Sequence, residues 1–283
     1  MRSPLTIVSY GNDLKQFFDF VGCAASDYAS IRDEDIRLWI INLMDAGMKP
    51  TSVRRKLSSL KSFYAYLLSH GLIVNNPAHN IKVPKIPKPI PAFFEESQID
   101  NAQQLIEEHT AFEAARNALI IELLYQTGLR RAELLGLKDV DIDWNRFTLR
   151  VFGKRSKERL VPFGSNLAEL IRNYQQLRND TVPRRCPNLF VRTNGTPMYA
   201  KAVYNIVVRY MGYVSTLQKH SPHVLRHTFA TTMLNNGAEL NAVKELMGHS
   251  SLAATEIYTH ITFEQIMQLY KQAHPHAEKN NRS

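Results

Sequence analysis

The chain has 283 residues, too many for a single small hydrophobic core, so its length favours two domains. A hydrophobic fraction of 44% argues against global disorder, and no apolar run is long enough for a membrane span. The formal net charge of +9 favours a polyanionic partner. Residues 1–13 lack the layout of a signal peptide, and Cys23 and Cys186 form no CxxC pair, so free thiols in the reducing cytoplasm are expected.

Three helices are predicted in the first part of the chain. Residues 6–21 and 33–44 carry apolar side chains at helical spacing, and the second segment has acidic residues in its first turn, where the helix dipole favours them. Residues 51–69 have the sharpest pattern, with one apolar stripe of Val53, Leu57, Leu60, Tyr64 and Leu67. We therefore expect a small all-helical domain at residues 1–81, which would bind DNA.

A basic, proline-rich connector is expected at residues 82–92, where alternating prolines prevent regular helix and give a semi-rigid linker. From Ala46 to Phe94 the chain contains no acidic residue. Because an ordinary solvated helix face mixes charges of both signs, this bias favours a helix and linker that follow DNA phosphates. The predicted DNA contacts are Lys49, Arg54, Arg55, Lys56, Ser58, Lys61, Lys82, Lys85 and Lys88.

Residues 93–283 are predicted to form a larger, mostly helical domain with a small antiparallel β-sheet. The nearly continuous apolar run at residues 114–125 indicates a buried helix. Strands are predicted at residues 147–152 and 159–163, on either side of a basic turn. Further helices are predicted at residues 167–177, 201–213, 225–235, 241–247 and 263–273.

Basic residues in this second part lie in recognisable local motifs. The stretch TGLRRAELLGL places Arg130 shortly after a glycine, at the entrance to a helix, and Glu133 is spaced to share a helix face with it. The motif GKRSKER is a basic hairpin tip that carries Lys154, which by itself could equally be a solvent-exposed turn. The motif HVLRH holds His223 and Arg226 one helical turn apart.

The stretch GHSSLAATEIYTH adds His249 and Tyr258 to this set. Two arginines, a lysine and two histidines around one tyrosine are what an enzyme needs to attack a phosphodiester with a phenolic oxygen and no metal ion. The sequence therefore favours DNA strand exchange.

Metal-dependent alternatives fit the sequence less well. His223 and His227 have the spacing of zinc ligands, but Val224 stands where a zinc protease has glutamate. The alternation of Asp139, Asp141 and Asp143 is similar to a calcium loop, but it lacks the glycine and the final glutamate that such a loop requires. No separate carboxylate set suits two-metal phosphoryl chemistry, so we predict no metal site and no cofactor.

Taken together, the segments around Arg130, Lys154, His223, Arg226, His249 and Tyr258 resemble the signature of the tyrosine recombinases, the phage integrase family. The resemblance covers nearly the whole chain, including the basic helix, the linker and the ending AHPHA, and it is greatest to Xer-type recombinases, which resolve chromosome dimers. A match at all six positions is highly specific, whereas any single motif is not. The family usually has another helix ahead of residues 6–21, and this chain has almost none of it, so either the start is trimmed or the small domain is reduced.

The resemblance implies a role for each motif residue. Tyr258 would be the nucleophile, and Arg130 and Arg226 would grip the non-bridging phosphate oxygens. His223 and His249 would add hydrogen bonds to the same oxygens. Lys154 would protonate the departing 5′-oxygen, and Glu133 would orient Arg130 without itself contacting the phosphate. The product would be a 3′-phosphotyrosyl bond and a free 5′-hydroxyl.

The resemblance also implies partners. Four protomers, identical or of two kinds, would act on two double-stranded DNA sites, with a second Xer recombinase or an activating cell-division protein as possible partners, and no membrane. A C-terminal helix would dock on a neighbour, although its apolar stripe could equally pack on its own domain. The competing hypotheses are an integrase of a compact mobile element, a related topoisomerase, and a non-catalytic DNA-binding protein that keeps the fold.

Overall fold

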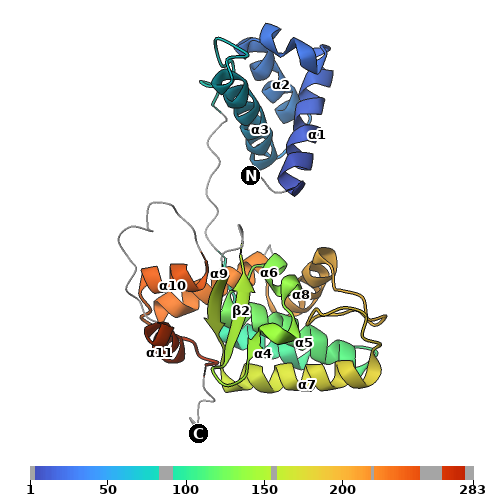
Figure 1. Ribbon diagram of the computed structural model, residues 1–283, viewed down its shortest axis with the longest axis vertical. Coiled ribbons are helices and arrows are strands. Elements are labelled where there is room, and N and C mark those ends of the chain that lie inside the picture. Colours follow the sequence, from blue (N-terminus) through green and yellow to red (C-terminus); the bar gives the residue numbers. More distant parts are fainter. Residues whose placement is uncertain (1–3, 83–91, 154–157, 218–219, 249–262, 278–283) are drawn as a thin grey trace. The chain divides into compact units, whose positions relative to one another are not determined.

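The computed structural model describes residues 4–82, 92–153, 158–217, 220–248 and 263–277 (Figure 1). The chain divides into two compact units, Met1–Pro89 and Ile90–Ser283. The described elements are mainly helices with one small antiparallel sheet, which confirms the predicted fold class. None of the helices in these ranges is both long and apolar enough to cross a bilayer.

The smaller unit is entirely helical in its described part. It consists of α1 (Pro4–Val21), the short 3-10 helix η1 (Ala25–Ser30), α2 (Asp33–Asp45) and α3 (Pro50–Ser69). Helix α2 starts where the backbone N–H of Arg32 donates to the carboxylate of Asp35 at 2.8 Å. Proline at the first position of α3 suits a helix start because its missing N–H would have no partner there. The core of this unit is built around Phe17, Ile36, Trp39, Leu60 and Tyr64.

The larger unit combines helices and a three-stranded sheet. Its helices are α4 (Glu96–Gln104), α5 (Ala111–Thr127), α6 (Arg131–Gly136), the 3-10 helix η2 (Asp139–Asp141), α7 (Ser165–Thr181), α8 (Ala200–Val214), α9 (Pro222–Asn235), α10 (Leu240–Leu246) and α11 (Phe263–Ala273). Its strands are β1 (Ile142–Asp143), β2 (Thr148–Phe152) and β3 (Glu158–Pro162).

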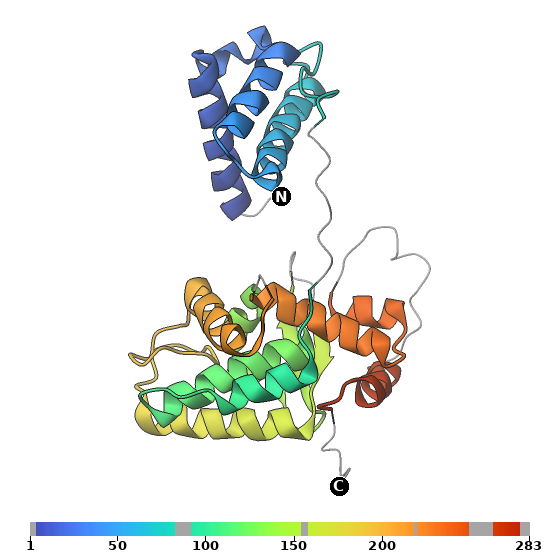
Figure 2. The same ribbon diagram turned by 180° about the vertical axis from the view of Figure 1, so that it is seen from behind.

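Helix α5 is the central element of the larger unit. Most of its length is buried, as its apolar sequence predicts, and α7 and α9 pack along it (Figures 1 and 2). The hydroxyl of Thr110 caps its start by accepting from the N–H of Glu113 at 3.2 Å. Gly128 ends it with a φ of 59°, and a Cβ on this glycine would lie 2.4 Å from Cδ1 of Phe229. Glycine is therefore required both by the backbone and by the close approach of α9.

The sheet has the strand order β1-β2-β3 with antiparallel pairing, and it places Val151 opposite Arg159. The predicted bounds of β2 and β3 are correct to within one residue. The tip of this hairpin, residues 154–157, lies outside the described residues.

The C-terminal helix α11 packs on its own chain. Its apolar stripe of Ile266, Tyr270 and Ala273 contacts a cluster that includes Phe229 and Met233 of α9. After the helix, the chain runs close to Gly164, where a Cβ would lie 2.3 Å from the carbonyl oxygen of Ala277. The end of the described chain is thus fitted tightly against the larger unit.

Two histidines in this final segment have pKa values that are shifted in opposite directions. Burial, together with the neighbouring His276, lowers the pKa of His274 to about 3, so this ring is neutral at neutral pH. Burial alone would also lower the pKa of His276, but Glu122, Asp100 and Glu96 raise it above its ordinary value. Nδ1 of His276 contacts the buried carboxylate of Glu122, and its Nε2 lies 3.3 Å from Glu96.

We expect the stabilising contribution of His276 to the larger unit to decrease as the pH rises from 6 to 9. Because the folded-state pKa of His276 is raised, its contribution is fully present below the unfolded value of 6.5 and is lost as the pH rises through the folded value. In urea unfolding, His276→Gln should cost about 1.5–3 kcal/mol at pH 6 and less at pH 9. The exposed His109→Gln is the control and should show no such trend; equal losses for His276→Gln at both pH values would contradict the prediction.

Candidate active site

Arg130 lies in the bend between α5 and α6, where the left-handed Gly128 turns the chain. Its Nη1 donates to Oε1 of Glu133 at 2.8 Å, and its backbone N–H donates to Oε2 at 2.9 Å. The contact predicted from their spacing is therefore present. Nη2 of Arg130 donates to the carbonyl oxygen of Gly248 at 3.0 Å, which ties this bend to the end of the α10 segment.

Arg226 comes from the second turn of α9 and is largely buried. Its Nη1 donates to the carbonyl oxygen of Gly128, and its Nη2 donates to that of Met247 at 2.6 Å. Burial, together with the positive charges of Arg130 and Arg159, lowers its pKa to about 10. The guanidinium is still protonated at neutral pH, but an anion that approached it would relieve this unfavourable environment.

Glu133 is the acidic partner of the cluster, and its side chain is only 4% exposed. Burial would raise its pKa, but hydrogen bonds from Arg159 and from the backbone of Arg130 outweigh burial and lower it. Arg159 of β3 donates to both carboxylate oxygens, at 3.1 and 2.8 Å. The sequence did not single out Arg159, whose signal is its place as the last residue of the basic motif GKRSKER.

The site carries an excess of positive charge. Three guanidinium groups, those of Arg130, Arg159 and Arg226, surround the single carboxylate of Glu133. Four of their donor bonds go to the carbonyl oxygens of Gly128, Leu246, Met247 and Gly248, which fix the groups without neutralising them. A fixed and incompletely neutralised pair of planar guanidinium groups suits the oxygens of a phosphate.

Of the other predicted catalytic residues, only His223 lies within the described part of the chain. His223 is exposed in the first turn of α9, one helical turn before Arg226. Lys154, His249 and Tyr258 lie outside the described residues. In the sequence, however, His249 directly follows Gly248, whose carbonyl oxygen binds Arg130.

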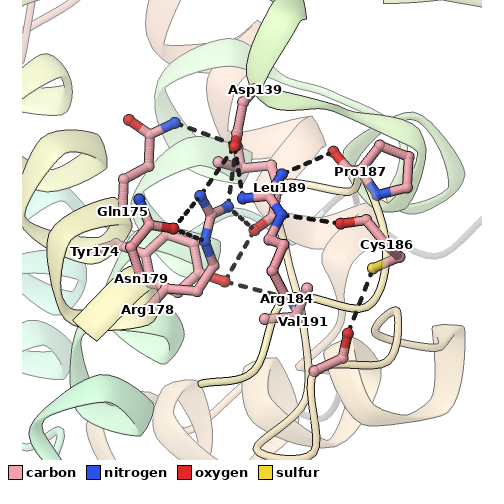
Figure 3. Close-up of polar contacts among 11 residues, drawn as sticks. Asp139, Tyr174, Gln175, Arg178, Asn179, Arg184, Cys186, Pro187, Leu189 and Val191 are labelled. Carbon is pink, nitrogen blue, oxygen red and sulfur yellow. Dashed lines mark hydrogen bonds and ion pairs between the residues drawn. The ribbon is translucent and has the colours of Figure 1, made fainter. Parts of the chain in front are cut away.

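The alternating aspartates have separate structural partners. Asp139 accepts from Arg178, which is almost fully buried, at 2.9 and 3.0 Å, and it also pairs with Arg184 (Figure 3). Asp141 accepts from the backbone of Lys138. These contacts hold the loop after α7 against η2. Within the described parts of the chain, no group of three or more His, Cys, Asp or Glu side chains is placed to hold a metal ion.

The predicted DNA-contacting residues of the smaller unit differ in their surroundings. Four of them are exposed: Lys49, Arg54, Ser58 and Lys82. Lys61, which is half-buried, donates to the carbonyl oxygen of His79 at 3.1 Å. Lys85 and Lys88 lie outside the described residues.

Two other basic residues of α3 bind the buried Asp13 instead of facing only solvent. Arg55, whose side chain is 46% exposed, donates to Oδ1 of Asp13 at 2.8 Å. Lys56 is 4% exposed and donates to the same oxygen at 3.1 Å, while its ammonium group also lies 5.8 Å from the ring centre of Trp39. The burial of Lys56 argues against its predicted role as a phosphate contact, because its charge is already paired inside the protein.

Comparison with known proteins identifies related sequences and folds. Residues 93–265 match the model of the phage integrase family, and residues 1–71 match that of the phage integrase N-terminal SAM-like domain. The tyrosine recombinase XerC of Chlorobaculum tepidum is 37% identical, with 97% of this chain and 90% of that protein covered. XerC of Pelobacter propionicus is 39% identical over 97% and 91%.

Solved structures agree with this similarity. The crystal structure of XerA recombinase aligns with a TM-score of 0.52 and 26% identity, over 97% of this chain and 93% of that one. A post-cleavage complex of XerH recombinase with its difH substrate aligns with a TM-score of 0.72 and 23% identity, over 94% and 79%. At that identity the second alignment supports the fold alone.

We expect Glu133→Gln to destabilise the larger unit by about 3–5 kcal/mol, because it leaves buried guanidinium groups without a counter-charge. Urea unfolding at neutral pH measures this loss. Glu158→Gln removes the same charge from an exposed position on β3 and should change stability by no more than about 0.5 kcal/mol. Equal effects of the two substitutions would show that the Glu133 carboxylate does not hold the cluster together.

A second prediction separates the basic residues of α3. Arg54→Gln should weaken DNA binding and reduce the slope of log affinity against log salt by about 1, as expected for one lost phosphate contact. Lys56→Met should leave that slope unchanged and lower the stability of the smaller unit, because Asp13 loses a buried partner. A reduced slope for Lys56→Met, or an unchanged one for Arg54→Gln, would reverse the assignment.

Proposed function

Because this chain belongs to the phage integrase family, we propose that it is a site-specific DNA recombinase that cleaves and rejoins DNA through a 3′-phosphotyrosyl intermediate. The observation that carries this proposal is the fixed pair of guanidinium groups. Arg130 and Arg226 bind the adjacent carbonyl oxygens of Gly248 and Met247, immediately before the segment that contains Tyr258.

The cleavage step joins the phenolic oxygen of Tyr258 to phosphorus and breaks the bond from phosphorus to the 5′-oxygen. A phenol has a pKa of about 10, so ionising it at neutral pH costs roughly 4 kcal/mol unless positive charge is near. Arg130 and Arg226 supply that charge and stabilise the non-bridging oxygens as negative charge develops in the pentacoordinate transition state. His223 and His249 add hydrogen bonds to the same oxygens.

Lys154 completes the balance of protons by donating one to the departing 5′-oxygen. The products are the phosphotyrosyl ester and a free 5′-hydroxyl, and the tyrosine proton leaves to solvent. Because the ester retains the energy of the broken bond, the hydroxyl of a partner strand can attack it and restore DNA without ATP.

We further propose that four protomers act on two double-stranded DNA sites in the cytoplasm and resolve chromosome or plasmid dimers. Curated relatives named XerC support this biological role, since they match nearly the whole chain at 34–39% identity. A second recombinase of this kind or an activating cell-division protein would be the partner. The integrase of the transposon Tn1549, a solved structure that bears on the mobile-element alternative, is 22–24% identical, so this likeness shows the fold alone.

A nicked suicide substrate that carries a candidate site tests the chemistry directly. Wild-type protein should form a covalent adduct that maps to Tyr258, and the reaction should continue in excess EDTA. Tyr258→Phe should form no adduct and bind the same DNA within about threefold, since one hydroxyl makes a small contribution to a large polar interface.

The matched control is Tyr213→Phe, which removes an exposed phenolic hydroxyl from the end of α8 and should cleave like wild type. An adduct formed by Tyr258→Phe, or a requirement for added metal, would contradict the proposed mechanism. DNA binding without any adduct in the wild-type protein would favour the non-catalytic alternative.

A further inference from the structure

Arg159 is the one guanidinium of the cluster that is not among the six predicted catalytic residues, although it ends the motif GKRSKER. It lies on β3 directly opposite Val151 of β2, at the base of the hairpin whose tip carries Lys154. Its side chain is 14% exposed. This places Arg159 between the strand pair and the Arg130 bend.

Every nitrogen of the Arg159 side chain is used within the protein. Nη1 and Nη2 donate to the two carboxylate oxygens of Glu133, and Nε donates to the carbonyl oxygen of Leu246 at 2.9 Å. A bidentate guanidinium–carboxylate pair fixes both distance and orientation, which a single-point contact does not. Each nitrogen of Arg159 therefore has at least one N–H bound to an acceptor within the protein.

These bonds connect three segments that are distant in the sequence. Glu133 holds Arg130, and Leu246 is followed directly by the carbonyl groups that bind Arg226 and Arg130. The space is also closely filled, because a Cβ on Gly248 would lie 3.0 Å from Nη1 of Arg159. A shift of Arg159 would therefore move the hairpin relative to both phosphate-binding arginines.

We infer that Arg159 is a positioning residue of DNA cleavage: it holds the hairpin that carries Lys154 in register with Arg130 and Arg226. The inference rests on the proposed function. Strand β3, which follows Lys154 in the sequence, and the arginine pair then belong to one hydrogen-bonded arrangement.

Cleavage rates of folded, DNA-saturated variants test this role. Arg159→Met should reduce the single-turnover rate by about 100-fold, the loss expected when a reacting group is displaced by about 1 Å. DNA affinity should stay within threefold, because Arg159 is bound to Glu133 and Leu246 within the protein. Arg159→Lys should recover only part of the rate, since an ammonium group cannot form the bidentate pair and the Leu246 bond together.

The matched control is Arg150→Met, which removes an arginine from the neighbouring strand β2. Arg150 is 45% exposed and pairs with Asp141 at 3.3 Å, away from Glu133. This variant should cleave within twofold of wild type. Circular dichroism and urea unfolding define a temperature at which each variant is folded, so that a loss of stability is not counted as a loss of rate.

A substrate with sulfur in place of the scissile 5′-oxygen tests the link to the hairpin, because a thiolate leaves without a proton donor. The defect of Arg159→Met should be at least tenfold smaller on this substrate than on normal DNA. An equal defect on both substrates, or a rate within threefold of wild type on normal DNA, would overturn the inference. If wild-type protein itself formed no adduct at Tyr258, the proposed function would fail first, and that result is distinguishable from failure of Arg159 alone.

Discussion

The larger unit depends on one buried carboxylate, that of Glu133. Three guanidinium groups come together around it, and such a concentration of positive charge would be unfavourable at low solvent exposure without a counter-charge. A single carboxylate is enough to hold Arg130 and Arg159 in place, but it leaves the cluster positive. The fold thus keeps an incompletely neutralised site, which is what a protein needs if an anionic ligand is to supply the missing charge.

Backbone carbonyl groups complete this arrangement. They orient Arg130 and Arg226 through hydrogen bonds while adding only partial charge, so the guanidinium groups remain cations with fixed directions. Gly128 shows how the backbone makes this possible. Its left-handed conformation ends α5, its missing side chain lets Phe229 approach, and its carbonyl oxygen accepts from Arg226.

Local patterns in the sequence predicted the helices and strands well, but they did not predict ion pairs between residues far apart in the sequence. Every residue of the predicted apolar stripe of α3 is buried. This stripe could be predicted because helical periodicity depends only on residues that are close in the sequence. The strand β1 was not predicted, since its two residues are defined by pairing with β2. The burial of Lys56 depends on Asp13 of another helix, and the role of Arg159 depends on Glu133 and Leu246, which are 26 and 87 positions away. By contrast, Arg130 and Glu133 are one turn apart, so their contact could be inferred.

The order of the chain links the proposed nucleophile to the groups that would activate it. Residues 249–262, with His249 and Tyr258, follow Gly248 directly and precede α11. Immediately before this segment, the carbonyl oxygens of Met247 and Gly248 accept hydrogen bonds from Arg226 and Arg130. At the other end, the stripe of α11 is packed into a cluster of buried residues from α9 and α10. A shift of Met247 or Gly248 would therefore disturb the hydrogen bonds that orient Arg130 and Arg226, so the geometry of the arginine pair is coupled to the backbone that immediately precedes residue 249.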